Sequence, residues 1–350
     1  MSPLIEIAGR PIGSGHPAYI IAELSANHGQ DFEQAVAIVR AAHAAGADAI
    51  KLQTYTADTI TLDCDREYFR VGPGTAWEGR VLHDLYREAS TPWDWQPRLQ
   101  AIARGLGLGF FSTPFDETAV EFLEKMDVPA WKIASFELVD LPLIRRVART
   151  GRPLIMSTGM ATLAEIEEAV QTARSAGAQQ LVLLKCTSGY PAEPEEMNLR
   201  TIPHLAQSFG VVAGLSDHTL GGAVPVAAVT LGASVIEKHL TLSRATPGPD
   251  SAFSLEPAEF RKMVDDIRVA ERALGTIHYG VSDREAASRI FRRSLFAVAE
   301  IQAGEAFTAA NVRSIRPGHG LHPRHLADVL TRRAACAIAR GTPLQWSHLQ

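Results

Sequence analysis

The sequence predicts an α/β barrel of the TIM (β/α)8 type followed by a small β-rich domain, on two observations. Apolar, strand-like runs alternate with segments of helical spacing eight times over about 250 residues, which is the size of such a barrel. Beyond about residue 282 this alternation stops, and short β-like pieces separated by turns replace it. The alternative is a doubly wound open sheet, which more often has a glycine-rich turn after its first strand, where this chain has residues 23–27 instead.

The eight strands are expected in chain order, after an N-terminal hairpin at residues 5–15. They are the apolar runs 19–24, 49–55, 109–115, 130–136, 153–158, 181–187, 211–218 and 235–242. A long insertion, residues 57–93, follows the second strand and contains Tyr68 and Trp77, so we expect a lid on the side that carries the site. Residues 256–274 have the apolar spacing of a closing helix.

We therefore divide the chain into a barrel domain with its hairpin, residues 1–280, a linker, residues 281–291, and a small domain, residues 292–350. The small domain contains a loop from Arg313 to Pro323 that is rich in arginine, glycine and histidine. This loop is interpreted either as a surface loop or as a segment that completes a site in another subunit, because small domains often dock onto a second copy.

Composition excludes several classes of function. The net charge of −5 and the lack of a lysine or arginine run argue against nucleic acid or an anionic membrane as a partner. Three widely spaced cysteines fit a reducing compartment better than a disulfide framework. The chain shows no signal-peptide pattern at its start and no apolar span of about 18 residues. We expect a globular protein of the cytoplasm.

Two histidines end neighbouring strands in the stretch from Gly214 to Leu242. One apolar run ends in Ser216-Asp217-His218, the next ends in Glu237-Lys238-His239, and a short helix joins them as a parallel crossover. His218 and His239 therefore lie at the same end of adjacent strands, where parallel α/β folds build their sites. Two imidazoles leave open positions on a divalent ion for substrate oxygens, as in catalytic sites. The alternative is a pair of hydrogen-bonded histidines in a polar rim.

Polar side chains follow every predicted strand. Beyond the histidines they are Glu23, Asn27, His28, Lys51, Gln53, Ser112, Thr113, Lys132, Ser135, Glu137, Ser157, Thr158, Lys185, Thr187, Ser188, Ser216 and Glu237. Converging lysines and hydroxyls suit a phosphate or a carboxylate, while the glutamates are suited to orient a sugar, hold the lysines or move a proton. Two other functions stay open at this point: a Schiff-base aldolase that uses Lys51, Lys132 or Lys185, and a non-catalytic sugar-binding barrel.

Many blocks of the chain, taken in order, resemble the sialic acid synthase family, whose members condense phosphoenolpyruvate with an amino sugar. They include IIAELSANH (20–28), GADAIKLQTYT (46–56), FSTPFD (111–116), KIASFE (132–137), STGMAT (157–162), LLKCTSGYP (183–191), GLSDHT (214–219), VIEKHLTL (235–242), GPDSAFSLEP (248–257) and RSIRPGHGLHP (313–323). Within the family, ELSANH and KIASFE are similar to the pseudaminic branch. Gly29 and Ser243 depart from the family pattern, which has asparagine and aspartate there.

The resemblance implies a TIM barrel joined to a C-terminal antifreeze-like (SAF) domain, assembled as a domain-swapped homodimer. It implies a transferase whose divalent ion, Mn²⁺ or Mg²⁺, is held by His218 and His239, with Glu137 as the proton-transfer residue. Phosphoenolpyruvate would be held by Lys51, Thr113, Lys132, Ser135, Ser157, Ser188 and Ser216. The amino sugar would meet Glu23, Tyr190, Asp250 and, from the partner subunit, Arg316.

Overall fold

The computed structural model describes residues 3–75 and 77–350. The chain forms two compact units that divide between Gly275 and Thr276. The first unit is a closed barrel of eight parallel strands in the order β10-β3-β4-β5-β6-β7-β8-β9, which confirms the predicted fold class. The strands are β3 (Tyr19–Glu23), β4 (Ala49–Thr54), β5 (Gly109–Pro114), β6 (Trp131–Ile133), β7 (Leu154–Ser157), β8 (Leu181–Cys186), β9 (Val212–Asp217) and β10 (Val235–His239).

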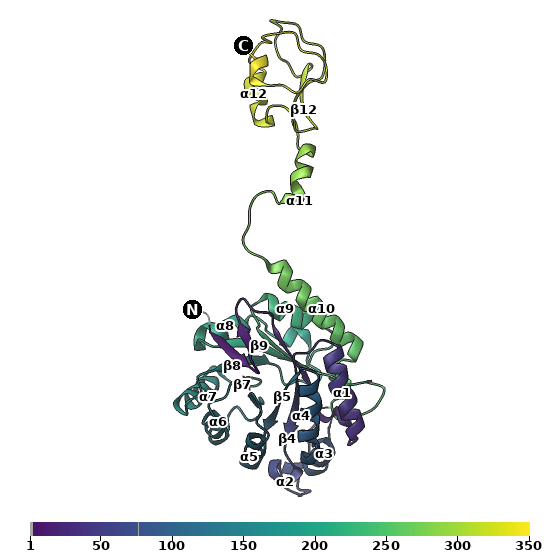
Figure 1. The fold of residues 1–350 in the computed structure, drawn as a ribbon, viewed down its shortest axis with the longest axis vertical. Helices are drawn as coiled ribbons and strands as arrows, with labels where there is room; N and C mark the ends of the chain where they lie inside the picture. Colours follow the sequence, from purple (N-terminus) through teal and green to yellow (C-terminus); the bar gives the residue numbers. More distant parts are fainter. Residues whose placement is uncertain (1–2, 76) are drawn as a thin grey trace. The chain divides into compact units, whose positions relative to one another are not determined.

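Helices surround the strands and complete the β/α repeat (Figure 1). They are α1 (Phe32–Ala44), α4 (Gln96–Gly105), α5 (Glu117–Lys125), α6 (Leu141–Ala148), α7 (Leu163–Ser175), α8 (Thr201–Phe209), α9 (Ala223–Thr230) and α10 (Pro257–Leu274). Helix α7 shows why they form: the Thr162 side chain and Glu165 make a reciprocal capping box at its start. Its buried residues, Ile166, Ala169, Val170 and Ala173, repeat every three to four positions and face the strands.

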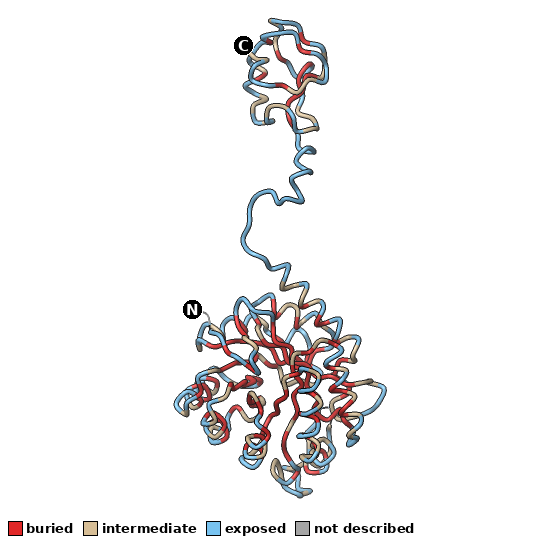
Figure 2. The backbone as a smooth tube through the Cα atoms, viewed as in Figure 1, coloured by how far each residue is buried: buried red, intermediate tan, exposed pale blue. Residues whose placement is uncertain are grey.

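The barrel strands are buried except for the half-buried Gln53, Gly109 and Lys185, and Figure 2 shows them as the buried centre of this unit. The predicted hairpin forms from β1 (Leu4–Ile7) and β2 (Arg10–Gly13), which pair in antiparallel register. Ala8 and Gly9 connect these strands with positive φ angles of 51° and 80°, the combination that a two-residue hairpin turn needs. Ile5, Ile7 and Ile12 are buried in the barrel's own core cluster, so the hairpin belongs to the core.

The insertion after β4 folds into short elements, as a lid would. They are α2 (Ala57–Ile60), η2 (Glu67–Phe69), α3 (Leu82–Ala89) and η3 (Trp93–Trp95). The Gln30 side chain, which follows η1 (Ser25–His28), donates hydrogen bonds of 2.8 and 2.7 Å to the carbonyls of Glu88 and Ser90. Since Gln30 follows β3 at its carboxyl end, these bonds tie the end of α3 to that side of the barrel. Short 3-10 turns also occur at η4 (Pro194–Glu196) and η5 (Ser251–Phe253).

The second unit has a core of its own. Strands β11 (Ser294–Ala297) and β12 (Val312–Ile315) pair in antiparallel register, and isolated bridges add further β-like pieces around them. Its other elements are α11 (Asp283–Ala286), η6 (Ala287–Phe291), η7 (Pro323–His325), α12 (Leu326–Val329) and η8 (Trp346–His348). Leu295, Phe307 and Leu344 are among the residues that form its buried cluster. Among the described residues of the whole chain, no helix combines the length and apolarity needed to cross a membrane.

Candidate active site

Charged side chains meet inside the barrel near the carboxyl ends of its strands. Lys51 Nζ forms an ion pair with Glu23 Oε2, and it lies 3.2 Å from Thr113 Oγ1 and 3.5 Å from Glu237 Oε1. Lys132 Nζ lies 4.0 Å from the same Glu237 oxygen. All five side chains are buried, so the barrel holds two ammonium groups and two carboxylates out of water in one group.

Burial and mutual attraction set the protonation of this group. Burial raises the pKa of Glu23 to about 7, against the attraction of Lys51. Burial also opposes charge on Glu237, but Lys132 and Lys51 outweigh it and lower the pKa of that carboxyl. Burial lowers the pKa of Lys132. An anion that entered here would meet cationic partners in a desolvated site, where electrostatic attraction is strong.

Glu237 is one of the polar residues that follow the predicted strands, although the family resemblance assigns it no role. Alternate residues of a strand face the same side, so Glu237 lies on the same face of β10 as His239. Its carboxylate also accepts a 3.4 Å hydrogen bond from Ser216 Oγ, which places the predicted Ser216 in the same group.

The structure brings the two predicted histidines together. The rings of His218 and His239 have centroids 5.3 Å apart, and both residues are buried. His218 Nδ1 lies 3.0 Å from the Thr187 carbonyl, which can only accept, so Nδ1 donates, and Nε2 carries the lone pair when this imidazole is neutral. Burial and the neighbouring His218 lower the pKa of His239 well below its usual value, so this imidazole is neutral.

These histidines fit a divalent ion with open coordination positions. His239 Nδ1 is buried and has no hydrogen-bond partner among the described residues, which leaves a polar atom that a ligand would satisfy. Residues 3–75 and 77–350 contain no cluster of three or more His, Cys, Asp and Glu side chains suited to a metal. The protein would thus supply two ligands and leave the remaining positions to substrate or water, unlike a closed structural zinc site.

Two predicted serines, Ser135 and Ser188, approach each other across Gly159, which is not among the predicted site residues. The Gly159 amide donates a 3.1 Å hydrogen bond to Ser135 Oγ. A Cβ atom at Gly159 would overlap Ser188 Oγ and would lie 2.7 Å from Ser135 Oγ. The nearby Ser157 hydroxyl is buried without a hydrogen-bond partner among the described residues. Only glycine leaves room for these hydroxyls to converge, as donors around an anion would.

Aromatic rings form a wall beside the histidines. The Tyr190 ring lies 4.5 Å from His218, and the Phe253 ring lies 5.0 Å from His239 and 5.1 Å from Tyr190. Trp77 of the lid lies 5.5 Å from the Tyr190 ring, and its indole N–H donates to the Pro249 carbonyl at 2.9 Å. The predicted Trp77 lid and Tyr190 are therefore part of one apolar surface, to which the structure adds Phe253.

Two predicted carboxylates occupy different surroundings. Glu137 follows β6, and burial raises its pKa to about 7, against the attraction of Lys132. Its Oε2 atom is buried and lacks a hydrogen-bond partner within the described part of the chain. Asp250 accepts hydrogen bonds from Ser25 Oγ and from the Ala26 amide, so its carboxylate is held against the end of β3. Glu137 therefore has the pKa near neutrality and, among the residues described, the free oxygen atom that a proton-transfer group needs, while the Asp250 carboxylate already has hydrogen-bond partners.

Other polar residues lie outside this group. Lys185 donates to the Cys186 carbonyl at 2.6 Å and to Thr187 Oγ1 at 3.0 Å, on its own strand end. Tyr68 in the lid is 89% exposed. Arg316 is exposed and follows β12 in the second unit.

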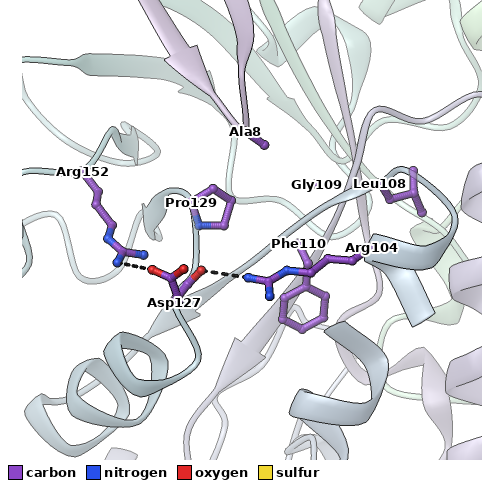
Figure 3. A pocket seen from close by; sticks show the side chains of 8 residues that line it. All are labelled: Ala8, Arg104, Leu108, Gly109, Phe110, Asp127, Pro129 and Arg152. Atoms are coloured by element: carbon purple, nitrogen blue, oxygen red, sulfur yellow. Dashed lines mark hydrogen bonds and ion pairs between the residues drawn. The ribbon is translucent and has the colours of Figure 1, made fainter. Parts of the chain in front are cut away.

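A hollow of about 350 Å³ lies at the amino ends of β5 to β7, at the other end of the barrel (Figure 3). Its polar groups already have partners: Arg152 pairs with Asp127 at 2.5 Å, and Arg104 donates to the Asp127 carbonyl at 3.0 Å. It contains none of the histidines, lysines or serines described above. The candidate site therefore lies at the carboxyl end, where the predicted residues gather.

Comparison with known proteins gives two family matches. The model described as the NeuB family matches residues 38–279, and the one described as the SAF domain matches residues 292–350. The chain is 44% identical to a pseudaminic acid synthase of Helicobacter pylori, over 94% of this chain and 96% of that protein. It is 36% identical to an N,N'-diacetyllegionaminic acid synthase of Legionella pneumophila, over 97% of both.

A solved structure agrees with the fold. The crystal structure of an N-acetylneuraminic acid synthetase from Leptospira borgpetersenii, in complex with citrate, aligns with a TM-score of 0.73 at 30% identity. The alignment covers 82% of this chain and 95% of that one.

Proposed function

The chain belongs to the NeuB family, and from this premise we propose that it condenses phosphoenolpyruvate with 2,4-diacetamido-2,4,6-trideoxy-L-altrose and water, giving pseudaminic acid and phosphate. The likeness to pseudaminic acid synthases supports the choice of sugar. The observation that carries the reaction is the pair of buried histidines beside buried lysines and converging hydroxyls at one barrel mouth.

Phosphoenolpyruvate is held through its phosphate and carboxylate. Its proposed partners are Lys51, Thr113, Lys132, Ser135, Ser157, Ser188 and Ser216. Lys51 and Lys132 carry the charges that neutralise the anion, and the serines around Gly159 donate hydrogen bonds. Because barrel strands fix these donors before the ligand arrives, little reorganisation is needed to hold C3 of phosphoenolpyruvate against an aldehyde carbon.

His218 and His239 hold the divalent ion, Mn²⁺ or Mg²⁺. When bound, the ion supplies Lewis-acid polarisation of the aldehyde oxygen of the open-chain sugar. The Thr187 carbonyl fixes the His218 ring, so that its Nε2 presents a lone pair without rearrangement.

The reaction forms one carbon–carbon bond and one carbon–oxygen bond, between C2 and the oxygen of water, and breaks the carbon–oxygen bond between C2 and phosphate. C3 of phosphoenolpyruvate attacks the aldehyde carbon, which leaves positive charge at C2. Water adds to C2 and gives up one proton, which balances the proton that the former aldehyde oxygen gains on becoming a hydroxyl. The tetrahedral intermediate then loses phosphate by cleavage of its C–O bond, and its C2 hydroxyl becomes the ketone as the hydroxyl proton leaves with phosphate. Glu137, whose pKa of about 7 lets it exchange protons near neutral pH, takes the proton from water. Buried carboxylates such as Glu23 stabilise the positive charge.

The sugar lies against the aromatic wall. A 6-deoxy sugar has a methyl group that prefers an apolar surface, and Tyr190, Phe253 and Trp77 provide one beside the histidines. Asp250, whose carboxylate is held by Ser25 and Ala26 after β3, and Glu23 accept hydrogen bonds from hydroxyl or acetamido N–H groups. Legionaminic and N-acetylneuraminic acid synthase activity are the alternatives, since relatives with these names also match.

We also propose that the protein acts as a domain-swapped homodimer, in which Arg316 completes the partner's site. The exposed guanidinium of Arg316 lies in a unit that folds around its own core, as a donor in trans would. Mixed dimers of His218→Ala and Arg316→Ala should recover activity that neither variant has, because one site of each hybrid is then intact. Equal inactivity of the mixture would contradict the exchange. The three free cysteines support a cytoplasmic location.

The test of the reaction is phosphate release from phosphoenolpyruvate with three sugars, namely the altrose derivative, N-acetylmannosamine and the legionaminic precursor. Each is assayed with and without Mn²⁺, in wild type and in His218→Ala. We expect Mn²⁺-dependent release with the altrose sugar that falls at least about 10³-fold in the variant, since Lewis-acid stabilisation supplies several kcal/mol. Preference for another sugar would move the protein to a sister branch. Release that survives EDTA, together with borohydride trapping, would indicate a Schiff-base aldolase instead.

A further inference from the structure

A buried ion pair lies directly behind the two histidines. Asp217 and Lys238 are paired in the register of β9 and β10, and Lys238 Nζ lies 2.5 Å from Asp217 Oδ2. Both side chains have 0% exposure. Side chains alternate along a strand, so this pair faces the helix layer while His218 and His239 face the barrel mouth.

The ion pair also fixes the turn that carries His218. The Asp217 carboxylate accepts hydrogen bonds from the Thr219 amide at 3.0 Å and from the Thr219 hydroxyl at 2.9 Å. Lys238 donates in addition to the Thr219 carbonyl. The residues on both sides of His218 are therefore bonded to one another and to the residue that precedes His239.

This network of charged groups lies in the layer between the strands and the helices, which is otherwise apolar. The neighbouring outward-facing residues of the same strands, Ala213, Leu215 and Ile236, are buried and apolar, as expected where a sheet packs under helices. A buried ion pair often adds no net stability over an apolar pair of similar size, because both charges must leave water. The best-supported use of such a pair is to fix one arrangement of the chain, which here is the arrangement of two strand ends.

We propose that Lys238, Asp217 and Thr219 are positioning residues that set the spacing of the His218 and His239 imidazoles for a divalent ion. This inference rests on the proposed function, since it concerns the same ion. The network holds the backbone at each histidine rather than touching an imidazole, and its effect therefore falls on ion affinity. Apart from Ser216, which precedes Asp217 on β9, the lysines and serines proposed to bind phosphoenolpyruvate belong to other strands and keep their positions.

The experiment measures Mn²⁺ affinity without substrates, by titration of the electron paramagnetic resonance signal of free Mn²⁺. The variants are Lys238→Met, Asp217→Asn, the double variant Lys238→Met/Asp217→Asn, and the milder Thr219→Val, which removes one hydroxyl donor at nearly constant size. We expect the Kd for Mn²⁺ to rise about 10-fold in the double variant, the lower end of the range for outer-shell partners of metal ligands. Phosphoenolpyruvate affinity, measured by calorimetry, should change less than about twofold, because all but one of its proposed partners lie outside β9 and β10.

Asp48→Asn is the matched control. It breaks the ion pairs of Asp48 with Arg10 and Arg268 at the amino end of the barrel, so it should lower Tm without changing the Kd for Mn²⁺. The double variant should keep a higher Tm than Lys238→Met alone, because no unpaired charge stays buried, yet it should still bind Mn²⁺ weakly. This separation of Tm from ion affinity is the result that a merely stabilising ion pair would not give.

Two results would overturn the proposal in distinguishable ways. Wild-type Mn²⁺ affinity in the double variant and in Thr219→Val, with affinity lost in His218→Ala, would overturn the positioning role and leave the ion site in place. Equal affinity of wild type and His218→Ala would overturn the ion site of the proposed function and the positioning role with it. If the double variant does not fold, an approximately threefold rise in Kd for Thr219→Val carries the proposal.

Discussion

The two ends of the barrel treat buried polar groups differently. At the amino end, Asp48 pairs with Arg10 and Arg268, and it also accepts the Ile20 amide at 2.8 Å. At the carboxyl end, buried polar atoms of Glu137, Ser157, Glu237 and His239 have no hydrogen-bond partner among the described residues.

An unsatisfied buried polar group costs about 1 to 3 kcal/mol of stability. At the amino end, ion pairs satisfy the buried polar groups, so this cost does not arise. At the carboxyl end, several neighbouring buried atoms stay unsatisfied, and each lowers the stability. Such groups are retained where a ligand completes their hydrogen bonds, so the comparison separates the end that stabilises the barrel from the end that binds. The following changes test that division, beginning with the largest expected effect.

Glu137→Gln tests whether an unpartnered carboxyl performs proton transfer. Glu137 is a base only when ionised, so wild-type kcat should rise with pH up to its pKa of about 7 and level off above it. In Glu137→Gln the rate should fall about 10²- to 10⁴-fold and the rise with pH should disappear. Glu137→Asp, which keeps a carboxylate, is the control and should keep the rise. A rise near pH 7 that persists in the glutamine variant would identify Glu23 as the titrating group instead.

Gly159→Ala tests the space between the serines. The added methyl group would displace the hydroxyls of Ser135 and Ser188, each of which contributes about 1.5 to 3 kcal/mol when bonded to an anion. We expect KM for phosphoenolpyruvate to rise about 10- to 100-fold, measured by phosphate release. Gly105→Ala in α4, where a Cβ meets no atom within 4 Å, is the matched control and should leave KM unchanged. Equal effects of both substitutions would show that the hydroxyls of Ser135 and Ser188 do not bind the anion.

Ser157→Ala and Asp48→Asn should shift stability in opposite directions. Removing the unpartnered Ser157 hydroxyl should raise the free energy of unfolding by about 1 kcal/mol in the ligand-free protein, at the expense of phosphoenolpyruvate affinity. Asp48→Asn should lower it by about 1 to 3 kcal/mol with kcat unchanged, because it removes the carboxylate that pairs with Arg10 and Arg268. Urea unfolding midpoints measure both changes. A loss of stability in Ser157→Ala would remove the contrast between the ends.

Much of the barrel could be predicted from its sequence because each strand is an apolar run of characteristic length. Some predicted strands are longer than the observed ones at their polar carboxyl ends. The predicted strand 130–136 is a strand only at Trp131–Ile133, since the chain leaves the sheet before Ser135 and Glu137. The pairing of His218 and His239 followed from strand order alone, and the structure brings their rings together.

The missed features depend on contacts between distant segments. Nothing near Gly159 in the chain shows that two serines from other strands approach it, and nothing near Trp77 shows its contact with Tyr190. Lys185 was grouped with the other strand-end lysines, yet it bonds to its own strand end. The strand-end pattern was enough to list Glu237, but three-dimensional packing was needed for the others.

Gly29→Asn tests how far the binding end extends and should have the smallest effect. Gly29 has a φ of 54° in the turn after Asn27, whose side chain donates to Leu240 O and Ser254 Oγ. Asparagine tolerates this left-handed conformation, and its Cβ would lie 3.4 Å from Gln34 Nε2, so stability should change by less than about 0.5 kcal/mol. Gly29→Val, with a branched side chain, should cost about 1 to 2 kcal/mol at the same φ. The KM for the sugar should stay within about twofold of wild type in the asparagine variant, because the turn supports Asn27 through its backbone. A larger rise in that KM, at unchanged stability, would show that the sugar reaches this turn and that the binding end includes it.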